Sequence, residues 1–235
     1  MQALILAGGF GKRLRSVVSD VPKPLAPINN YPFIYYQLRY LEKYNFQKVF
    51  ISVGYKKELI INYIKKNNFS FDIKFIEENS PLGTGGAIKH FLSTLDSEID
   101  ENFFVFNGDT YFPIDLSEFY RFYLYLNSDL SIASRNMDKN DRYSSIDVDE
   151  NNRIIKFLKP DGNSSLINGG IYIFKKNKIN SIFFANMNES FSVEEDIFPI
   201  AIYKISCHTK KFDADFIDIG IPDDYAKASD IILKN

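Results

Sequence analysis

Apolar runs of strand length alternate with longer amphipathic stretches along the first half of the chain. Polar residues or glycines bound the apolar runs, which predicts strands over residues 2–7, 48–53, 71–76 and 102–106. The stretches between them have the length and periodicity of helices, which predicts helices over residues 33–44, 56–66 and 84–95. Strands that alternate with helices in this way predict a mostly parallel sheet with helices on both faces.

The second half of the chain is richer in strand-like runs. We expect strands over residues 130–134, 144–148, 154–158, 170–174, 205–212 and 215–219, with a hairpin turn at residues 149–152. Helices are expected over residues 175–185, 193–203 and 223–233, and Asp115 with Glu118 forms a capping box for one more helix. Because no segment resembles a linker, we predict one α/β domain over residues 1–235 with a β-rich extension.

Charge and composition exclude several classes of protein. The 235 residues include 28 Lys+Arg and 30 Asp+Glu, and the resulting net charge of −2 argues against a general nucleic-acid-binding protein. An anionic ligand must therefore be met by a local group of cations. The lone Cys207 excludes an intrachain disulfide framework and a cysteine zinc site, and it suits a reducing compartment. Since no run resembles a signal peptide or a membrane span, we expect a cytoplasmic protein without membrane insertion.

A glycine-rich loop with nearby cations follows the first predicted strand. The loop reads Leu6-Ala7-Gly8-Gly9-Phe10-Gly11-Lys12-Arg13, and its glycines let backbone amides approach an anion closely. The cations of this segment are Lys12, Arg13, Arg15 and Lys23. Neither familiar phosphate loop fits, because Leu14 stands where a Rossmann fingerprint needs its third glycine and no Ser or Thr follows Lys12 as in a Walker loop.

Three motifs in order give the chain a family resemblance. The glycine loop is followed by Pro22-Lys23-Pro24-Leu25 and, near the C-terminus, by Ile219-Gly220-Ile221-Pro222-Asp223. With these motifs the chain resembles, over essentially its full length, the sugar-phosphate nucleotidyltransferases, which join a sugar 1-phosphate to a nucleoside triphosphate and release pyrophosphate. The resemblance implies a Rossmann-like mixed, mostly parallel sheet, with residues 1–112 mainly binding the nucleotide and residues 113–235 mainly the sugar phosphate. Lys12 departs from the family, which has a small hydroxyl residue there; a lysine could add a phosphate contact.

The resemblance implies a second nucleotide-binding loop at residues 78–87, after the third predicted strand. Glu78 stands where pyrimidine-specific relatives commonly carry Gln. A carboxylate only accepts hydrogen bonds, which suits the neighbouring N1–H and N2–H donors of guanine, so we expect GTP; a solvated strand-end acid is the alternative interpretation of Glu78. The expected nucleotide-binding residues are Leu6, Ala7, Gly8, Gly9, Gly11, Lys12, Arg13, Lys23, Glu78, Pro81, Gly83, Thr84 and Asp109.

Two aspartates follow or end apolar strand-like runs. Asp109 follows the run at residues 102–106, and Asp218 lies in the run at residues 215–219. Carboxylates at the carboxyl ends of strands reach the ligand crevice of an α/β sheet. The matching aspartates hold Mg²⁺ in the family, and two carboxylates with phosphate oxygens and water suit that ion. The resemblance further implies that Arg13 stabilises the leaving pyrophosphate and that Lys23 screens the nucleophile from the α-phosphate. We therefore expect a Mg²⁺ cofactor and four catalytic residues, Arg13, Lys23, Asp109 and Asp218.

The resemblance also implies contacts to the sugar hydroxyls. Asn168 and Gly169 match an Asn-x-Gly-Ile-Tyr segment whose amide contacts the sugar; a glycine-weakened strand or bulge is the alternative. Glu194 matches an acid that accepts a sugar hydroxyl. Capping of a helix by Ser192, with acids in the first turn, explains the same segment equally well.

Two further sugar-side segments match the family with one departure each. Arg142 and Tyr143 match an Arg-Tyr-Gly segment in which Ser144 replaces the glycine. Lys159 matches a lysine that contacts the sugar phosphate, but Leu158 replaces the Glu that normally precedes it. These departures leave the shape of the sugar pocket open.

Within the family, residues 14–24 and the short length are most similar to D-glycero-D-manno-heptose 1-phosphate guanylyltransferases, which supply GDP-heptose for surface polysaccharides. Mannose 1-phosphate with GTP is the nearest alternative, followed by uridylyl, thymidylyl or cytidylyl transfer to another sugar 1-phosphate. A non-catalytic nucleotide-sugar sensor would be expected to lose Arg13, Lys23, Asp109 or Asp218, and all four are present. Aromatic clusters at residues 31–44 and 119–125 are interpreted as core or subunit interface, which leaves a homodimer open.

Overall fold

The computed structural model describes residues 1–138, 142–159, 165–183 and 188–234, apart from the side chains of Lys12, Ser165 and Phe183. The strands are β1 (Gln2–Ala7), β2 (Pro27–Ile28), β3 (Tyr31–Pro32), β4 (Lys48–Val53), β5 (Asp72–Glu77), β6 (Asn102–Asn107), β7 (Thr110–Tyr111), β8 (Leu130–Met137), β9 (Ser145–Val148), β10 (Ile154–Leu158), β11 (Ser165–Lys175), β12 (Cys207–Lys211) and β13 (Ile217–Asp218). The α-helices are α1 (Phe33–Glu42), α2 (Lys57–Lys65), α3 (Gly83–Leu95), α4 (Leu116–Tyr125), α5 (Lys176–Phe183), α6 (Phe198–Lys204) and α7 (Pro222–Ile232). No helix in these described ranges is both long and apolar enough to cross a membrane.

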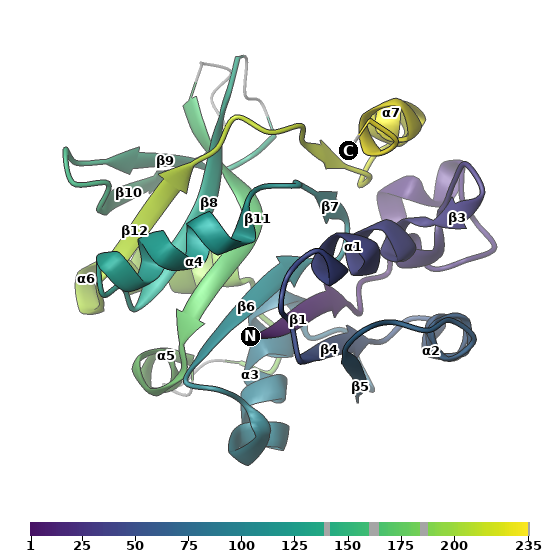
Figure 1. Ribbon diagram of the computed structural model, residues 1–235, viewed down its shortest axis with the longest axis horizontal. Coiled ribbons are helices and arrows are strands. Elements are labelled where there is room, and N and C mark those ends of the chain that lie inside the picture. Colours follow the sequence, from purple (N-terminus) through teal and green to yellow (C-terminus); the bar gives the residue numbers. More distant parts are fainter. Residues whose placement is uncertain (139–141, 160–164, 184–187, 235) are drawn as a thin grey trace.

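One mixed sheet forms the centre of the molecule (Figure 1). The strands β6, β1, β4 and β5 lie side by side and are parallel, as the alternation of strands and helices predicted. Beyond β6 the long strand β11 runs antiparallel, and β8 and β9 both pair with it. The β9–β10 hairpin and the parallel pair β8–β12 complete the β-rich second half. The predicted fold class is therefore confirmed.

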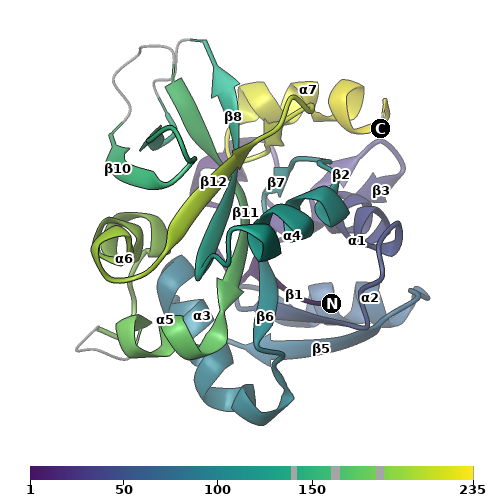
Figure 2. The ribbon, with the colours of Figure 1, turned by 60° about the vertical axis from the view of Figure 1, so that its left-hand side comes forward.

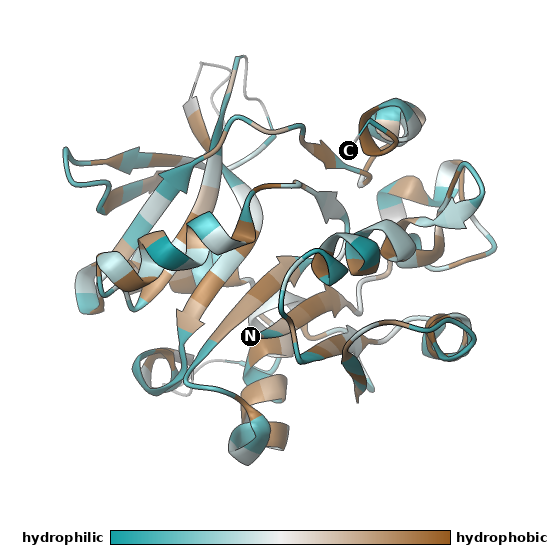
Figure 3. Ribbon diagram, in the orientation of Figure 1, coloured by the Kyte–Doolittle hydropathy of each residue, from teal (hydrophilic) through white to brown (hydrophobic). Residues whose placement is uncertain are grey.

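Helices cover both faces of this sheet, because its central strands are apolar at successive positions and so present apolar side chains to both sides. Figure 3 shows these strands mostly in the brown of hydrophobic residues. On one face, side chains of α1, α2, α4 and α7 join Ala3, Ile5 and Phe104 of the central strands in one core. On the other face, α3, α5 and α6 pack on Leu4 and Val105. Figure 2 shows α4 and α1 on the same side of the sheet, with α3 and α5 on the other. The sheet is thereby buried on both sides.

Two predicted elements differ from the observed ones for identifiable reasons. The helix expected over residues 193–203 is a π-turn, Val193–Ile197, followed by α6, which has Pro199 in its first turn. Proline has no amide hydrogen, so a single α-helical hydrogen-bond ladder cannot run through that position. The strand expected over residues 215–219 is only Ile217–Asp218, which pairs with β7 outside the main sheet. The other predicted strands and helices are present, with shifts at their ends and a longer β11.

Loops that follow the parallel strands meet at one edge of the sheet. The glycine loop follows β1, Gly54 follows β4, Glu78 follows β5 and Asp109 follows β6. The chain passes from β1 to β4 on one side and later returns to place β6 on the other side of β1. Open α/β sheets bind ligands at such a reversal, outside the carboxyl ends of their strands.

Candidate functional site

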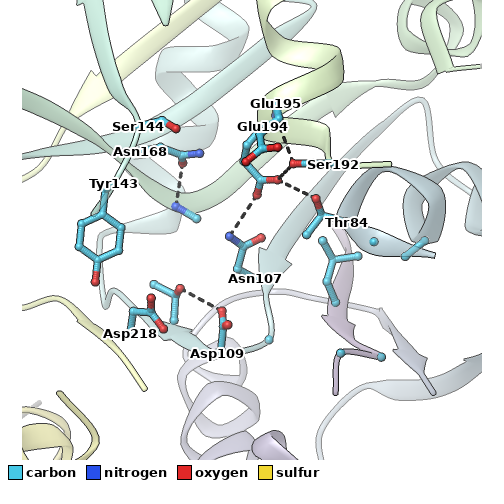
Figure 4. Close-up of a pocket in the computed structure, with 18 of the residues that line it drawn as sticks. Thr84, Asn107, Asp109, Tyr143, Ser144, Asn168, Ser192, Glu194, Glu195 and Asp218 are labelled. Carbon is cyan, nitrogen blue, oxygen red and sulfur yellow. Dashed lines mark hydrogen bonds between the residues drawn. The ribbon is translucent and has the colours of Figure 1, made fainter. Parts of the chain in front are cut away.

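A cleft of about 490 Å³ opens at this edge and continues into a second hollow of about 210 Å³ beside Lys23. Both are lined by Leu6, Gly9, Arg13, Gly108 and Asp109, so they form one site. Other expected site residues line one or the other: Ala7, Gly8, Gly11, Lys23, Glu78, Pro81, Gly83, Thr84, Tyr143, Ser144, Asn168, Glu194 and Asp218. The structure thus brings nearly all of the predicted nucleotide-binding and sugar-binding residues together. Figure 4 shows part of this cleft.

The glycine loop is shaped by close approaches that exclude larger side chains. Gly11 has φ of 60° and ends the loop where a short 3₁₀ helix, Lys12–Ser16, begins. A Cβ atom at Gly8 would lie 2.1 Å from Glu78 Oε1, so the glycine makes room for the carboxylate of the second loop. The loop therefore keeps backbone, rather than side chains, along the cleft. The side chain of Lys12, which could add a phosphate contact, lies outside the described part of the structure.

Three charged side chains meet on the floor of the cleft. The Lys23 ammonium lies 2.5 Å from Asp109 Oδ2 and 3.8 Å from Asp218 Oδ1. Burial by itself raises the pKa of Asp109. The Lys23 charge and the hydrogen bonds from Lys23, the backbone and Thr110 together outweigh burial and hold that pKa below its ordinary value. Burial, and then the negative charge of Asp109, raises the pKa of Asp218 above its ordinary value. The two carboxylates therefore repel one another, and a cation between them relieves the repulsion.

Asp218 reaches this cluster through a strand pair that the sequence pattern did not predict. β13 pairs antiparallel with β7, which places Asp218 opposite Thr110, and the Ile219 amide donates to the Asp109 carbonyl at 3.0 Å. Sequence reasoning placed Asp218 at the end of a strand of the main sheet. Asp218 instead lies in the separate two-stranded sheet of β7 and β13, which still brings its carboxylate next to Asp109.

The donor set fits a Mg²⁺ ion. Asp109 and Asp218 converge on one cation, the Lys23 ammonium, which shows that positive charge is stabilised between them. In the described ranges there is no cluster of three or more Asp, Glu, His or Cys side chains that could form an all-protein cage. Mg²⁺ is commonly held by one or two carboxylates with substrate phosphates and water, which matches this pair.

Glu78 is held in a defined position at the start of the second loop. The Ser52 hydroxyl donates to Glu78 Oε1 at 2.7 Å, and the Leu82 amide donates to Oε2 at 3.3 Å. The residue is 8% exposed and lines the cleft beside Gly8. A buried and hydrogen-bonded carboxylate is not a solvated strand-end acid, so that alternative interpretation is wrong.

A polar network surrounds Glu194 on the other side of the cleft (Figure 4). The Ser192 hydroxyl donates to Glu194 Oε2 at 3.0 Å and accepts from the Glu195 amide at 3.1 Å. The capping interpretation is therefore confirmed, because the Ser192 side chain caps the π-turn. Glu194 also lines the cleft, and its contact with a sugar hydroxyl stays a prediction. The hydroxyl of the fully buried Tyr172 donates to Glu194 Oε1 at 3.2 Å. Thr84 and Asn107 also donate to this carboxylate, so four described polar side chains orient it.

Asn168 and the two glycines after it form an irregular part of β11. Pairing with β8 shifts between Asn168 and Tyr172, so the segment is a bulge as well as part of the cleft. Asn168 donates to the Tyr172 hydroxyl at 2.9 Å and accepts from the Gly170 amide at 2.9 Å. Gly170, with φ of 73°, lines the cleft, whereas Gly169 packs under the Phe112 ring. The prediction of Gly169 as a site residue is wrong by one position, since alternate residues of a strand face opposite sides.

Among the expected residues whose side chains the structure describes, Lys159 is the other one that does not line the cleft. Its side chain is exposed, and it directly follows the edge strand β10. Leu158 pairs with Ser145, so the backbone passes near the sugar side while the lysine remains outside the cleft lining. The rest of its motif, from Pro160, lies outside the described residues.

Sequence reasoning missed several residues that line the cleft, among them Asn107 and Arg142. Asn107 immediately precedes the Gly108-Asp109 pair, and its place at the end of a predicted strand was a usable signal. Its side chain donates to Glu194 Oε1 at 3.5 Å. Arg142 precedes Tyr143 in a motif that was recognised, and only its ion pair with Asp218 shows that it reaches the site.

Fold and site together define a protein of the α/β nucleotide-binding class, with a glycine-rich loop and paired carboxylates at the carboxyl edge of its sheet. The chain matches the nucleotidyl transferase family over residues 2–235 and belongs to that family.

Relatives of known activity are similar over almost the whole chain. A D-glycero-α-D-manno-heptose 1-phosphate guanylyltransferase of Campylobacter jejuni is 43% identical over 96% of this chain and 97% of its own length. An enzyme with the same description from Aneurinibacillus thermoaerophilus is 41% identical over 97% and 96%, respectively. The crystal structure of HddC from Yersinia pseudotuberculosis, also solved in complex with GMP-PN, has a TM-score of 0.83 at 38% identity and covers 97% of this chain and 98% of HddC.

Proposed function

We propose that this protein joins GTP and D-glycero-D-manno-heptose 1-phosphate to give GDP-heptose and pyrophosphate. The observation that carries the proposal is the cleft in which Arg13, Lys23, Asp109 and Asp218 lie beside the glycine loop. Support for the choice of substrates comes from the 41–43% identity to heptose 1-phosphate guanylyltransferases over nearly the full chain. The reaction would take place in the cytoplasm. Its product, GDP-heptose, would be used for the synthesis of surface polysaccharides.

The proposed chemistry needs no general base. The attacking oxygen of a sugar phosphate is already ionised near neutral pH, so catalysis depends on positioning and on neutralising charge. Arg13 lines both parts of the cleft, where it would stabilise charge on the leaving pyrophosphate. Lys23 would screen the incoming phosphate from the α-phosphate. Asp109 and Asp218 would hold Mg²⁺, which supplies further positive charge beside the phosphate oxygens.

Glu78 would select the base. Its carboxylate is buried next to Gly8 and can accept hydrogen bonds from the adjacent N1–H and N2–H groups of guanine. Uracil and thymine present one donor between two acceptors. A carboxylate has no donor for those acceptors, so it pairs poorly with these bases. Leu6, Pro81, Gly83 and Thr84 would complete the nucleotide side.

The sugar would lie on the side of the cleft that the second half of the chain supplies. Glu194 and Asn168 present oriented polar atoms there, and Tyr143 and Ser144 line the adjoining wall. We therefore assign nucleotide binding mainly to residues 1–112 and sugar binding mainly to residues 113–235. One hydrogen bond joins the two parts, because Thr84 of the nucleotide part donates to Glu194 of the sugar part.

The test is pyrophosphate release, measured with Mg²⁺ for each of GTP, ATP, UTP, CTP and dTTP against heptose and mannose 1-phosphates. We expect release with GTP and the heptose substrate at the highest kcat/KM. A preference for mannose 1-phosphate would replace the sugar assignment, and a preference for a pyrimidine nucleotide would refute the role of Glu78. No release from any pair would favour a nucleotide-sugar sensor.

Variants of the charged cluster test the mechanism in the same assay. Asp109→Ala and Arg13→Ala are expected to lower kcat by at least about a hundredfold, as loss of a group that stabilises transition-state charge does. Asp72→Asn is the matched control, because Asp72 is exposed at the far, amino end of β5. Circular dichroism establishes that each variant is folded. Near-normal turnover by Asp109→Ala would overturn the assignment.

A further inference from the structure

A sugar 1-phosphate brings a dianionic phosphate that the cleft must neutralise on its sugar side. Lys159, the residue expected there, is exposed and does not line the cleft. Among the described side chains, the cations that line the cleft are Arg13, Lys23 and Arg142. Arg13 and Lys23 belong to the glycine-loop side, so Arg142 is the cation that the sugar-side wall contributes.

Arg142 forms ion pairs with two carboxylates at the cleft. Its Nη2 lies 2.9 Å from Asp218 Oδ2, and its Nη1 is paired with Asp224 at the start of α7. The guanidinium also lies 4.9 Å from the centre of the Tyr143 ring. In Figure 4, Tyr143, the neighbour of Arg142, stands beside Asp218 and across the cleft from Thr84. The side chain is 25% exposed, so it is held in place and still accessible from the cleft.

We propose that Arg142 binds the phosphate of the sugar 1-phosphate, in the role that the family resemblance implied for Lys159. The inference rests on the proposed function. A guanidinium presents five N–H donors in a planar fork that matches phosphate oxygens, and two carboxylates and an aromatic ring fix the plane of this one. Arg142 would then lie next to Asp218, where the sugar phosphate must meet the second substrate.

A purely structural role is the competing explanation, because the pair with Asp224 also connects the segment around Tyr143 to α7. Asp224→Asn removes the negative charge from this ion pair, which weakens the connection to α7, and leaves the guanidinium in the cleft. The Asp224 variant therefore separates docking of α7 from binding of phosphate.

The experiment compares Arg142→Gln, Arg142→Lys, Asp224→Asn and Lys159→Ala in steady-state kinetics with GTP and heptose or mannose 1-phosphate. We expect Arg142→Gln to raise KM for the sugar phosphate by about 10- to 100-fold, the loss typical of hydrogen bonds to a charged group, with less than about twofold change in KM for GTP. Arg142→Lys should recover part of the loss because it keeps the charge. Asp224→Asn and Lys159→Ala should change KM for the sugar phosphate by less than about threefold.

Three results would overturn the inference: an unchanged KM in Arg142→Gln, an equal loss in Asp224→Asn, or the main loss in Lys159→Ala. Calorimetric titration of the same variants with mannose 1-phosphate and heptose 1-phosphate separates this inference from the proposed function. If the wild-type protein binds sugar phosphates without turnover, the proposed function fails, and the titration still decides the role of Arg142. If the wild-type protein binds neither, both fail.

Discussion

The Thr84 hydroxyl donates a hydrogen bond of 2.6 Å to Glu194 Oε2, across 110 residues of sequence. The same hydroxyl accepts from the Val193 amide at 2.9 Å, so its donor and one of its acceptor positions are used. Thr84 lies in the first turn of α3, within the predicted nucleotide-binding loop at residues 78–87. Glu194 lies in the π-turn and is predicted to contact the sugar. This contact joins the two halves of the cleft.

Replacing Thr84 by valine tests that connection. Thr84→Val keeps the shape of the side chain but leaves the Val193 amide without its partner and removes one of the donors to Glu194, so we expect the free energy of unfolding to fall by about 1–3 kcal/mol. KM for the sugar phosphate should rise more than KM for GTP, because Glu194 loses one of the groups that orient it. Thr84→Ser keeps the hydroxyl and serves as the control. An increase in KM for GTP alone would contradict the connection and favour direct contact of Thr84 with the nucleotide.

Gly8→Ala should destabilise the protein through Glu78. The new Cβ would lie 2.1 Å from Glu78 Oε1 and displace the carboxylate from Ser52, at an expected cost of about 1–3 kcal/mol in the free energy of unfolding by urea. In a Glu78→Ala background the same substitution should cost much less, because nothing is displaced. At Gly9, no described atom lies within 4 Å of a Cβ, so Gly9→Ala should change the free energy of unfolding by less than about 0.5 kcal/mol. Equal costs of Gly8→Ala in both backgrounds would refute the explanation.

The Tyr172 hydroxyl is expected to position the sugar-binding groups without touching the sugar. Tyr172→Phe removes the bonds to Asn168 and Glu194, so kcat/KM for the sugar phosphate should fall by about tenfold. Tyr123→Phe is the matched control, because its hydroxyl donates to Asn102 Oδ1 at 2.6 Å, at the opposite end of β6. If the two variants have the same kinetics, the positioning role of Tyr172 is wrong.

Cys207 should be unreactive in the folded protein. It is fully buried in β12, and burial raises the pKa of its thiol to about 12. We therefore expect iodoacetamide at pH 8.5 to label Cys207 far more slowly in the native protein than in urea. Equal rates would show that the thiol is accessible.

The raised pKa of Cys207 also predicts how the free energy of unfolding changes with pH. Above the pKa of an unfolded thiol, the unfolded chain releases a proton that the folded protein retains, so stability is lost as pH rises toward 12. The stability of the wild-type protein relative to Cys207→Ala should fall by about 1.4 kcal/mol for each pH unit in that range. A pH-independent difference, measured by urea unfolding at several values, would contradict the shift.

Much of the local structure could be predicted from the sequence because it depends on short-range patterns. The strands β1 and β4 and the Asp115 cap, whose side chain accepts from the Glu118 amide, follow from hydrophobic period and capping chemistry. The failures have local causes as well. Pro199 interrupts a helix that its neighbours favour. Alternation along β11 turns Gly169 away from the face that Asn168 and Gly170 present to the cleft.

The sequence by itself determined the order of strands and helices, the chemistry of the glycine loop and the set of cations and carboxylates available. Only the tertiary structure decided which of these meet. The pairing of β13 with β7 brings Asp218 to Asp109, packing of the π-turn on α3 brings Glu194 to Thr84, and the ion pair with Asp218 brings Arg142 into the cleft while Lys159 stays outside. The reason is physical: periodicity and capping act over a few residues, whereas these contacts join segments that only the packing of the whole sheet holds together.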